Sequence, residues 1–119
     1  MDSHIVLRLD HDPVLVRPEW RVVLAEKAND VFVSPVTAWE LGMKRAKGNL
    51  AFVGEVSDMV ARLGFRELPI TMAHGAMAAA MDWVHRDPFD RMLVAQARVE
   101  GLRLVTADAV IRDYFGDCL

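Results

Sequence analysis

The chain has 119 residues, with 14 Lys and Arg against 17 Asp and Glu, and a formal net charge of −3 at pH 7. This length predicts a single domain over residues 1–119, and a hydrophobic content of 53% is typical of a globular rather than a disordered protein. The mild acidity argues against a protein that holds nucleic acid by bulk electrostatic attraction. It leaves room for an acidic pocket that acts on a phosphodiester.

Several further classes of protein are excluded by the same inspection. Cys118 is the only cysteine, so an internal disulfide and a cysteine-rich zinc site are both ruled out. The longest stretch without Asp, Glu, Lys or Arg runs from Leu68 to Met81, which is shorter than the roughly 18 apolar residues of a membrane span. The first residues carry no basic segment ahead of an apolar one, so no secretory signal is expected. We therefore expect a cytoplasmic protein with no membrane association.

The first half of the chain is expected to alternate short strands with longer helices. Residues 5–9 fit either a strand or the first turns of a helix, and Pro18 opens a helix that reaches about Ala28. Residues 31–33 are a β-branched and aromatic run that predicts a buried strand. Ser34-Pro35 then suits the cap and first position of a helix over 35–46. A helix over 52–63 and a weak strand over 65–68 follow.

The second half continues this alternation. Thr71 is expected to cap an alanine- and methionine-rich helix that reaches about Trp83. Asp87-Pro88 starts the next helix, which ends at Gly101, and a strand over 102–106 and a short helix over 109–114 complete the chain. Strands that alternate with helices predict parallel β-α-β units, and hence an α/β fold in which a central parallel sheet lies between two helical layers.

Four acidic residues stand where such a fold collects function, beyond the carboxyl ends of strands. Asp108 follows the strand over 102–106, Glu40 lies in the second turn of a helix that follows a strand, Asp90 lies in the first turn of another helix, and Asp2 stands at the start of the chain. Clustered carboxylates repel one another, so a cluster of this kind usually needs cations, and hard oxygen ligands suit Mg²⁺ or Mn²⁺. Two such ions, roughly 4 Å apart, can activate a water and stabilise the leaving oxygen of a phosphodiester.

Three acidic residues of these segments also have a purely structural interpretation. Asp87 is a natural helix cap, Asp90 favours the helix dipole, and Asp108 fits the cap of the last helix. Lys44 and Arg45 are expected either to be solvated at the end of their helix or to contact phosphate. Arg86 and Arg91 are expected either to contact phosphate or to pair with the neighbouring carboxylates while metal is absent. Of the histidines, we interpret His74 and His85 as packing residues, because no pair has metal-ligand spacing.

The motifs resemble, in order, those of the PIN domain, and specifically of VapC-type toxins of bacterial toxin–antitoxin pairs. The opening Met1–His4 resembles Leu-Asp-Thr-His, and Val33–Lys44 resembles Val-Ser-x-x-(Ser/Thr)-x-Trp-Glu-(Ile/Leu)-x-x-Lys. The stretch His85–Ala97 is nearly a copy of the third motif of that family, and Leu104–Asp108 is similar to the fourth. The resemblance covers almost the whole chain.

This resemblance implies an activity, a site and partners. The acidic metal site would consist of Asp2, Glu40, Asp90 and Asp108, with Thr106 and Ser34 adding hydroxyl hydrogen bonds and Asp87 in a supporting or capping position. The implied activity is endoribonuclease cleavage of RNA by a water that Mg²⁺ or Mn²⁺ activates. The implied partners are an RNA substrate, a VapB-like antitoxin that neutralises the enzyme, and a second copy of the chain.

The start of the chain departs from the family pattern. Relatives carry a short apolar run ahead of the first Asp, which forms the central strand, whereas only Met1 precedes Asp2 here. Three explanations are open: the start is misassigned, the chain is truncated, or another segment replaces this strand. We expect a first strand that is truncated. An alternative function follows, a catalytically impaired PIN-like module that acts only in dimerisation or antitoxin binding. A carboxylate-based Mg²⁺ phosphatase ranks third, because Ser34 and Lys44 are wrongly placed for its phosphate-binding residues.

Overall fold

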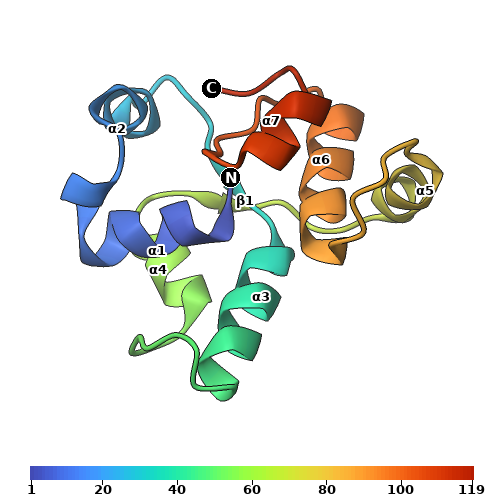
Figure 1. Cartoon of the computed structure of the whole chain (residues 1–119). Coiled ribbons are helices and arrows are strands. Elements are labelled where there is room, and N and C mark those ends of the chain that lie inside the picture. Colours follow the sequence, from blue (N-terminus) through green and yellow to red (C-terminus); the bar gives the residue numbers. More distant parts are fainter.

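The computed structural model describes residues 1–119 and has an α/β fold in which helices surround a small parallel sheet (Figure 1). The helices in chain order are α1 Ser3–His11, the 3₁₀ turn η1 Pro13–Leu15, α2 Pro18–Ala25, α3 Pro35–Ala46, α4 Val56–Arg62, α5 Met72–Ala80, α6 Pro88–Glu100 and α7 Ala109–Tyr114. The strands are β1 Phe32–Val33 and β2 Arg66–Glu67. No helix is long and apolar enough to cross a membrane.

Local capping signals define the helices that carry the acidic residues. The Ser34 hydroxyl accepts from the backbone N–H of Val36 at 3.1 Å, and Pro35 occupies the first turn of α3. The Asp87 carboxylate caps α6 in the same way, and Gly101, with φ of 66°, ends that helix in the left-handed conformation. The sequence predictions for α3, α6 and α7 are therefore confirmed.

The sheet consists of β1 and β2 paired in parallel, with Phe32 opposite Arg66 and Val33 opposite Glu67. The backbone N–H groups of Arg66 and Leu68 donate to the carbonyls of Val31 and Val33, each at 2.9 Å. The residues between the strands form α3 and α4, as in a β-α-β unit. The parallel connection that the sequence predicts is therefore present.

The expected strand over 102–106 is not formed. Its residues are extended and buried at Leu104, Val105 and Thr106, but Leu104 makes only an isolated parallel bridge with Cys118. The Asp2 N–H donates to the Val105 carbonyl at 2.9 Å and is the only backbone link from the N-terminus to this segment. With no strand beside it, the segment cannot build a ladder, so the sheet is narrower than expected.

A cavity of about 330 Å³ lies between this extended segment and β1. Its lining is mostly apolar, and Met1, Phe32, Gln96, Leu104 and Val105 contribute to it. Burial of the Met1 amino group lowers its pKa from 8.0 to about 6, because the charged form loses its water.

Three helix ends differ from the sequence predictions. Helix α2 ends at Ala25 rather than Ala28, and the Asn29 side chain donates to the Val23 carbonyl at 2.9 Å near that end. Helix α4 begins at Val56 rather than Phe52, because Gly54 has φ of 88° and interrupts the pattern. Helix α5 ends at Ala80, three residues before Trp83. Residues 5–9 prove to be helical and belong to α1.

The buried apolar side chains form two clusters. One joins α3, α6 and α7 and includes Val36, Leu93, Val94 and Ile111. The other joins the N-terminal helices to β1 and Val105. The first turns of α1, α3 and α6 emerge from these clusters, which fixes where the acidic side chains point.

Candidate functional site

Asp2 is held at the start of α1 by both its backbone and its side chain. Its carboxylate accepts from the His4 N–H at 3.1 Å and from the Thr106 hydroxyl at 3.1 Å. Burial alone would raise the pKa of this carboxyl, but the hydrogen bonds from His4 and Thr106 outweigh it, so the pKa of Asp2 lies below its usual value. Asp2 is therefore a well-anchored carboxylate in its ionised form.

Glu40 projects from the second turn of α3. Lys44, one turn further along the same helix, lies with its Nζ 3.2 Å from the Glu40 carboxylate and 3.4 Å from His4 Nε2. The Ser3 hydroxyl donates to Thr37 Oγ1 at 3.3 Å, and both residues are fully buried. This contact ties α1 to α3, and so fixes Asp2 and Glu40 relative to each other.

Asp90 and Asp87 lie at the start of α6. The Asp87 carboxylate accepts from the backbone N–H groups of Phe89 and Asp90, whereas Asp90 is free of capping duty and contacts His85 Nε2 at 2.7 Å. Burial raises the pKa of Asp90, and the negative charges of Asp87 and Asp108 add to that rise, while His85 opposes it. Asp90 is thus a half-buried carboxylate in a field of negative charge, which a cation would relieve.

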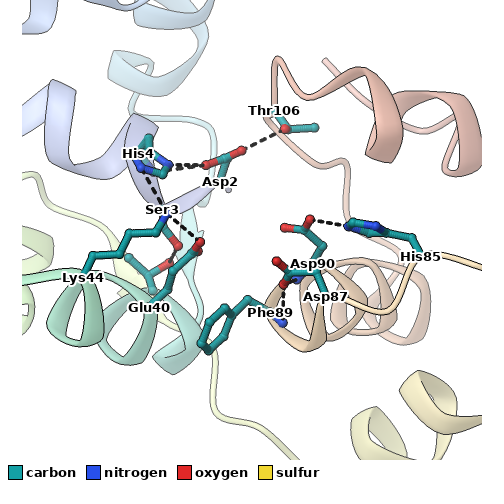
Figure 2. A network of polar contacts seen from close by, with 11 residues as sticks. Asp2, Ser3, His4, Glu40, Lys44, His85, Asp87, Phe89, Asp90 and Thr106 are labelled. Atoms are coloured by element: carbon teal, nitrogen blue, oxygen red, sulfur yellow. Dashed lines mark hydrogen bonds and ion pairs between the residues drawn. The ribbon is translucent and has the colours of Figure 1, made fainter. Parts of the chain in front are cut away.

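The three anchored carboxylates face one space. Figure 2 shows the side chains of Asp2, Glu40 and Asp90 pointing toward one another from α1, α3 and α6. Asp108 stands at the edge of this group: its carboxylate caps α7 by accepting from the Val110 N–H at 2.9 Å. The Thr106 hydroxyl connects the two ends of the site, since it donates to Asp2 and accepts from the Asp108 N–H at 3.0 Å.

The most compact group of potential ligands differs from the four acidic residues that the sequence singles out. His85, Asp87 and Asp90 place one ligand atom each within 4.8 Å of one another, and this is the only group of at least three that does so. His85 packs against Trp83, with ring centroids 4.9 Å apart, and its Nε2 also lies 2.7 Å from the Asp90 carboxylate, so our interpretation of it as a packing residue was incomplete. His74 does pack as expected: it is fully buried in the cap of α5. The position of His85 inside the third motif was the signal that pointed to the site.

Three further residues lie outside the site. Ser34 is 5% exposed, and its hydroxyl caps α3 by accepting from the Val36 N–H. The Arg45 guanidinium donates to the Phe52 and Gly54 carbonyls and lies over the Phe52 ring, where it fastens the loop after α3. Arg91 donates to backbone carbonyls in the segment before α6. These placements give all three side chains a structural task instead of the contacts expected from the sequence.

Two basic side chains remain available near the carboxylates. Lys44 is part of the network in Figure 2. Arg86 is exposed and its side chain makes no hydrogen bond or ion pair within the chain. Of the four cations expected to contact phosphate, these two are the ones whose side chains the fold leaves for that purpose.

The order of these acidic motifs and the fold agree with a comparison against protein families. A family model for the PIN domain matches residues 2–115. The chain belongs to the PIN domain family. Comparisons with curated proteins and with solved structures find no match.

Family membership agrees with the chemistry of the site. PIN domains are typically metal-dependent nucleases, that is, hydrolases, and usually bind divalent metals. Carboxylate and hydroxyl oxygens surround the space between α1, α3 and α6, and these are the ligands that hard divalent cations prefer. The residues present thus fit a divalent cation.

Proposed function

We propose that this PIN domain is a VapC-type toxin, an endoribonuclease that depends on Mg²⁺ or Mn²⁺ and acts in the cytoplasm. The observation that carries the proposal is the convergence of Asp2, Glu40 and Asp90, which face one space from the N-cap of α1, from α3 and from α6. Helix capping does not explain this convergence, because Glu40 and Asp90 cap no helix.

Each residue then has a task in cleaving an RNA phosphodiester. Asp2, Glu40 and Asp90 would hold the cation, with Asp108 contributing from the edge of the site. A divalent cation in such a site activates a water and stabilises the leaving oxygen. Thr106 keeps Asp2 oriented through its hydroxyl, and Lys44 is placed to meet a phosphate beside Glu40.

The partners follow from the same proposal. A toxin of this kind needs a VapB-like antitoxin that neutralises it, and we propose a homodimer as its working form. Exposed apolar side chains that such contacts could cover include Val22 of α2, Met72 of α5 and Val84 in the segment before α6.

The test is RNA cleavage by the purified protein. We expect cellular RNA to be cleaved in the presence of Mg²⁺ or Mn²⁺, and cleavage to stop on adding EDTA or in Asp90→Asn. Asp113→Asn is the matched control, because Asp113 is an exposed residue of α7 that takes part in no ion pair. If the protein with an intact N-terminus cleaves no RNA at any concentration of either metal, the enzymatic proposal fails.

The second candidate is a PIN-like module that has lost catalysis and serves only in dimerisation or antitoxin binding. One observation favours it: each facing carboxylate is already engaged by a basic side chain, Asp2 by His4, Glu40 by Lys44 and Asp90 by His85. This module would form a dimer or bind an antitoxin in sedimentation experiments while leaving RNA intact under every metal condition.

A further inference from the structure

Trp39 is the one aromatic residue of the chain whose side chain is largely exposed. The chain has three Trp, one Tyr and five Phe, and all of these except Trp39 are buried or half-buried. Trp39 is 57% exposed, although it lies on α3, whose other large apolar residues are at least half-buried. Packing within the chain therefore does not account for a ring of this size at this position.

The ring is nevertheless held in place. Trp39 meets Phe89 of α6 edge to face, with ring centroids 4.7 Å apart and an interplanar angle of 88°. Phe89 is fixed in turn, because its N–H donates to the capping carboxylate of Asp87. An edge-to-face contact occupies at most one face of the indole. The ring therefore has a fixed orientation, and part of its surface stays exposed to solvent.

The position of this aromatic pair relative to the site is set by the helices. Trp39 directly precedes Glu40 on α3, and Phe89 directly precedes Asp90 on α6. The two aromatic rings thus bridge the same pair of helices that presents Glu40 and Asp90 to the space in Figure 2. A nucleic acid whose phosphate reaches these carboxylates therefore lies beside the pair of helices that carries the Trp39 ring.

We propose that Trp39 is a stacking site for the nucleobase next to the scissile phosphate, and this rests on the proposed ribonuclease function. Stacking of a base on an aromatic side chain contributes to binding without requiring a particular base, since every base has a π-face. Because only an unstacked base can reach the ring, Trp39 selects an unpaired nucleotide at that position. A protein partner fits less well, because Trp39 is isolated on its helix among a small exposed residue, Ala38, and the carboxylate of Glu40.

The experiment measures kcat and KM on a single-stranded oligoribonucleotide that the wild-type protein cleaves with Mg²⁺. We expect Trp39→Leu to lower kcat/KM about 5- to 150-fold, the range that follows from loss of one stacked base, mostly through KM. Trp39→Phe retains a ring and is expected to keep most of the activity. Val14→Ala is the matched control, since Val14 is 74% exposed in η1, which carries none of the carboxylates.

An abasic scan identifies the stacked base. Each nucleotide of the oligoribonucleotide is replaced in turn by an abasic one. For the wild-type protein, we expect one abasic replacement beside the scissile phosphate to lower kcat/KM by the same factor as Trp39→Leu. For the Trp39→Leu protein, the same replacement should lower kcat/KM no further.

Three outcomes would overturn the proposal, and they are distinguishable. If the wild-type protein cleaves RNA but the abasic scan is the same in Trp39→Leu, the ribonuclease function stands and the stacking site is wrong. If Trp39→Leu dissociates a dimer in sedimentation while kcat/KM is unchanged, the ring is a protein contact. If the wild-type protein cleaves no RNA, the proposed function fails and the stacking site fails with it.

Discussion

Arg91 offers the sharpest test of how the candidate site is supported. Its guanidinium donates five hydrogen bonds of 2.7 to 3.1 Å to four backbone carbonyls, those of Ala78, Met81, Trp83 and His85. These carbonyls belong to the end of α5 and to the irregular segment before α6, which has no helix or sheet to satisfy its backbone. The perturbations we choose are Arg91→Lys and Arg91→Met.

The magnitude follows from this count. A hydrogen bond that involves a charged group contributes about 1.5 to 3 kcal/mol, but five bonds from one side chain are not additive, and water can replace some of them because Arg91 is half-buried. We expect Arg91→Lys, which has no planar fork, to lower the free energy of unfolding by about 2 to 3 kcal/mol. Arg91→Met leaves all four carbonyls without this donor and should cost about 3 to 5 kcal/mol.

Urea denaturation followed by circular dichroism measures both variants, with Arg86→Lys and Arg86→Met as matched controls on an exposed arginine of the same region. The controls are expected to change the free energy of unfolding by less than about 0.5 kcal/mol. The reasoning is refuted if Arg91→Lys is as stable as the wild-type protein but binds RNA more weakly with a shallower salt dependence. That result would make Arg91 the phosphate contact that the sequence suggests.

Three further predictions concern stability and the site. Because the pKa of the Met1 amino group falls from 8.0 to about 6 on folding, the unfolded chain holds an extra proton between these pH values. The free energy of unfolding should therefore rise by about 2 kcal/mol from pH 6 to pH 8, and acetylation of the amino group should remove this rise in urea titrations. Thr106→Val removes the hydroxyl shared by Asp2 and Asp108, so cleavage activity should fall about tenfold or more while Thr106→Ser retains it; equal activity of the two variants contradicts the role of this hydroxyl. Leu41→Ala empties a fully buried position and should cost about 2 to 5 kcal/mol in the same titrations, and a cost below 1 kcal/mol would show that the core under α3 is loose.

Helix starts were the most predictable part of the fold, because they depend on neighbouring residues. Ser34-Pro35 and Asp87-Pro88 each place a capping oxygen directly before a proline, and α3 and α6 begin at those prolines. Thr71 likewise caps α5 as predicted. The three acidic residues that face one another were also singled out from the sequence, because they stand at the positions of the PIN-family motifs.

Long-range partners could not be predicted in the same way. Whether residues 102–106 form a strand depends on the chain beside them, and that information is absent from their own apolar pattern. The end of α5 depends on Arg91, whose guanidinium donates to the carbonyl of Ala78, thirteen residues earlier in the sequence. The task of Arg45 likewise appears only when the Phe52 ring is seen to lie beneath its guanidinium. Charged residues near a motif look alike in sequence, whether their hydrogen bonds go to the backbone or to a ligand.

The basic partners of the facing carboxylates explain how a chain of net charge −3 gathers negative charge in one place. Asp2, Glu40 and Asp90 each lie within 3.6 Å of a nitrogen of His4, Lys44 or His85, and these bases come from the same elements as the acids or from the loop just before them. Such contacts offset part of the mutual repulsion that would otherwise oppose folding of the site. A divalent cation that enters must displace these basic side chains. Its binding free energy is therefore the free energy of its contacts with the carboxylates minus that of the contacts between carboxylates and bases that it breaks. The same displacement frees the nitrogen of Lys44 from Glu40, which is where a phosphate group would need it.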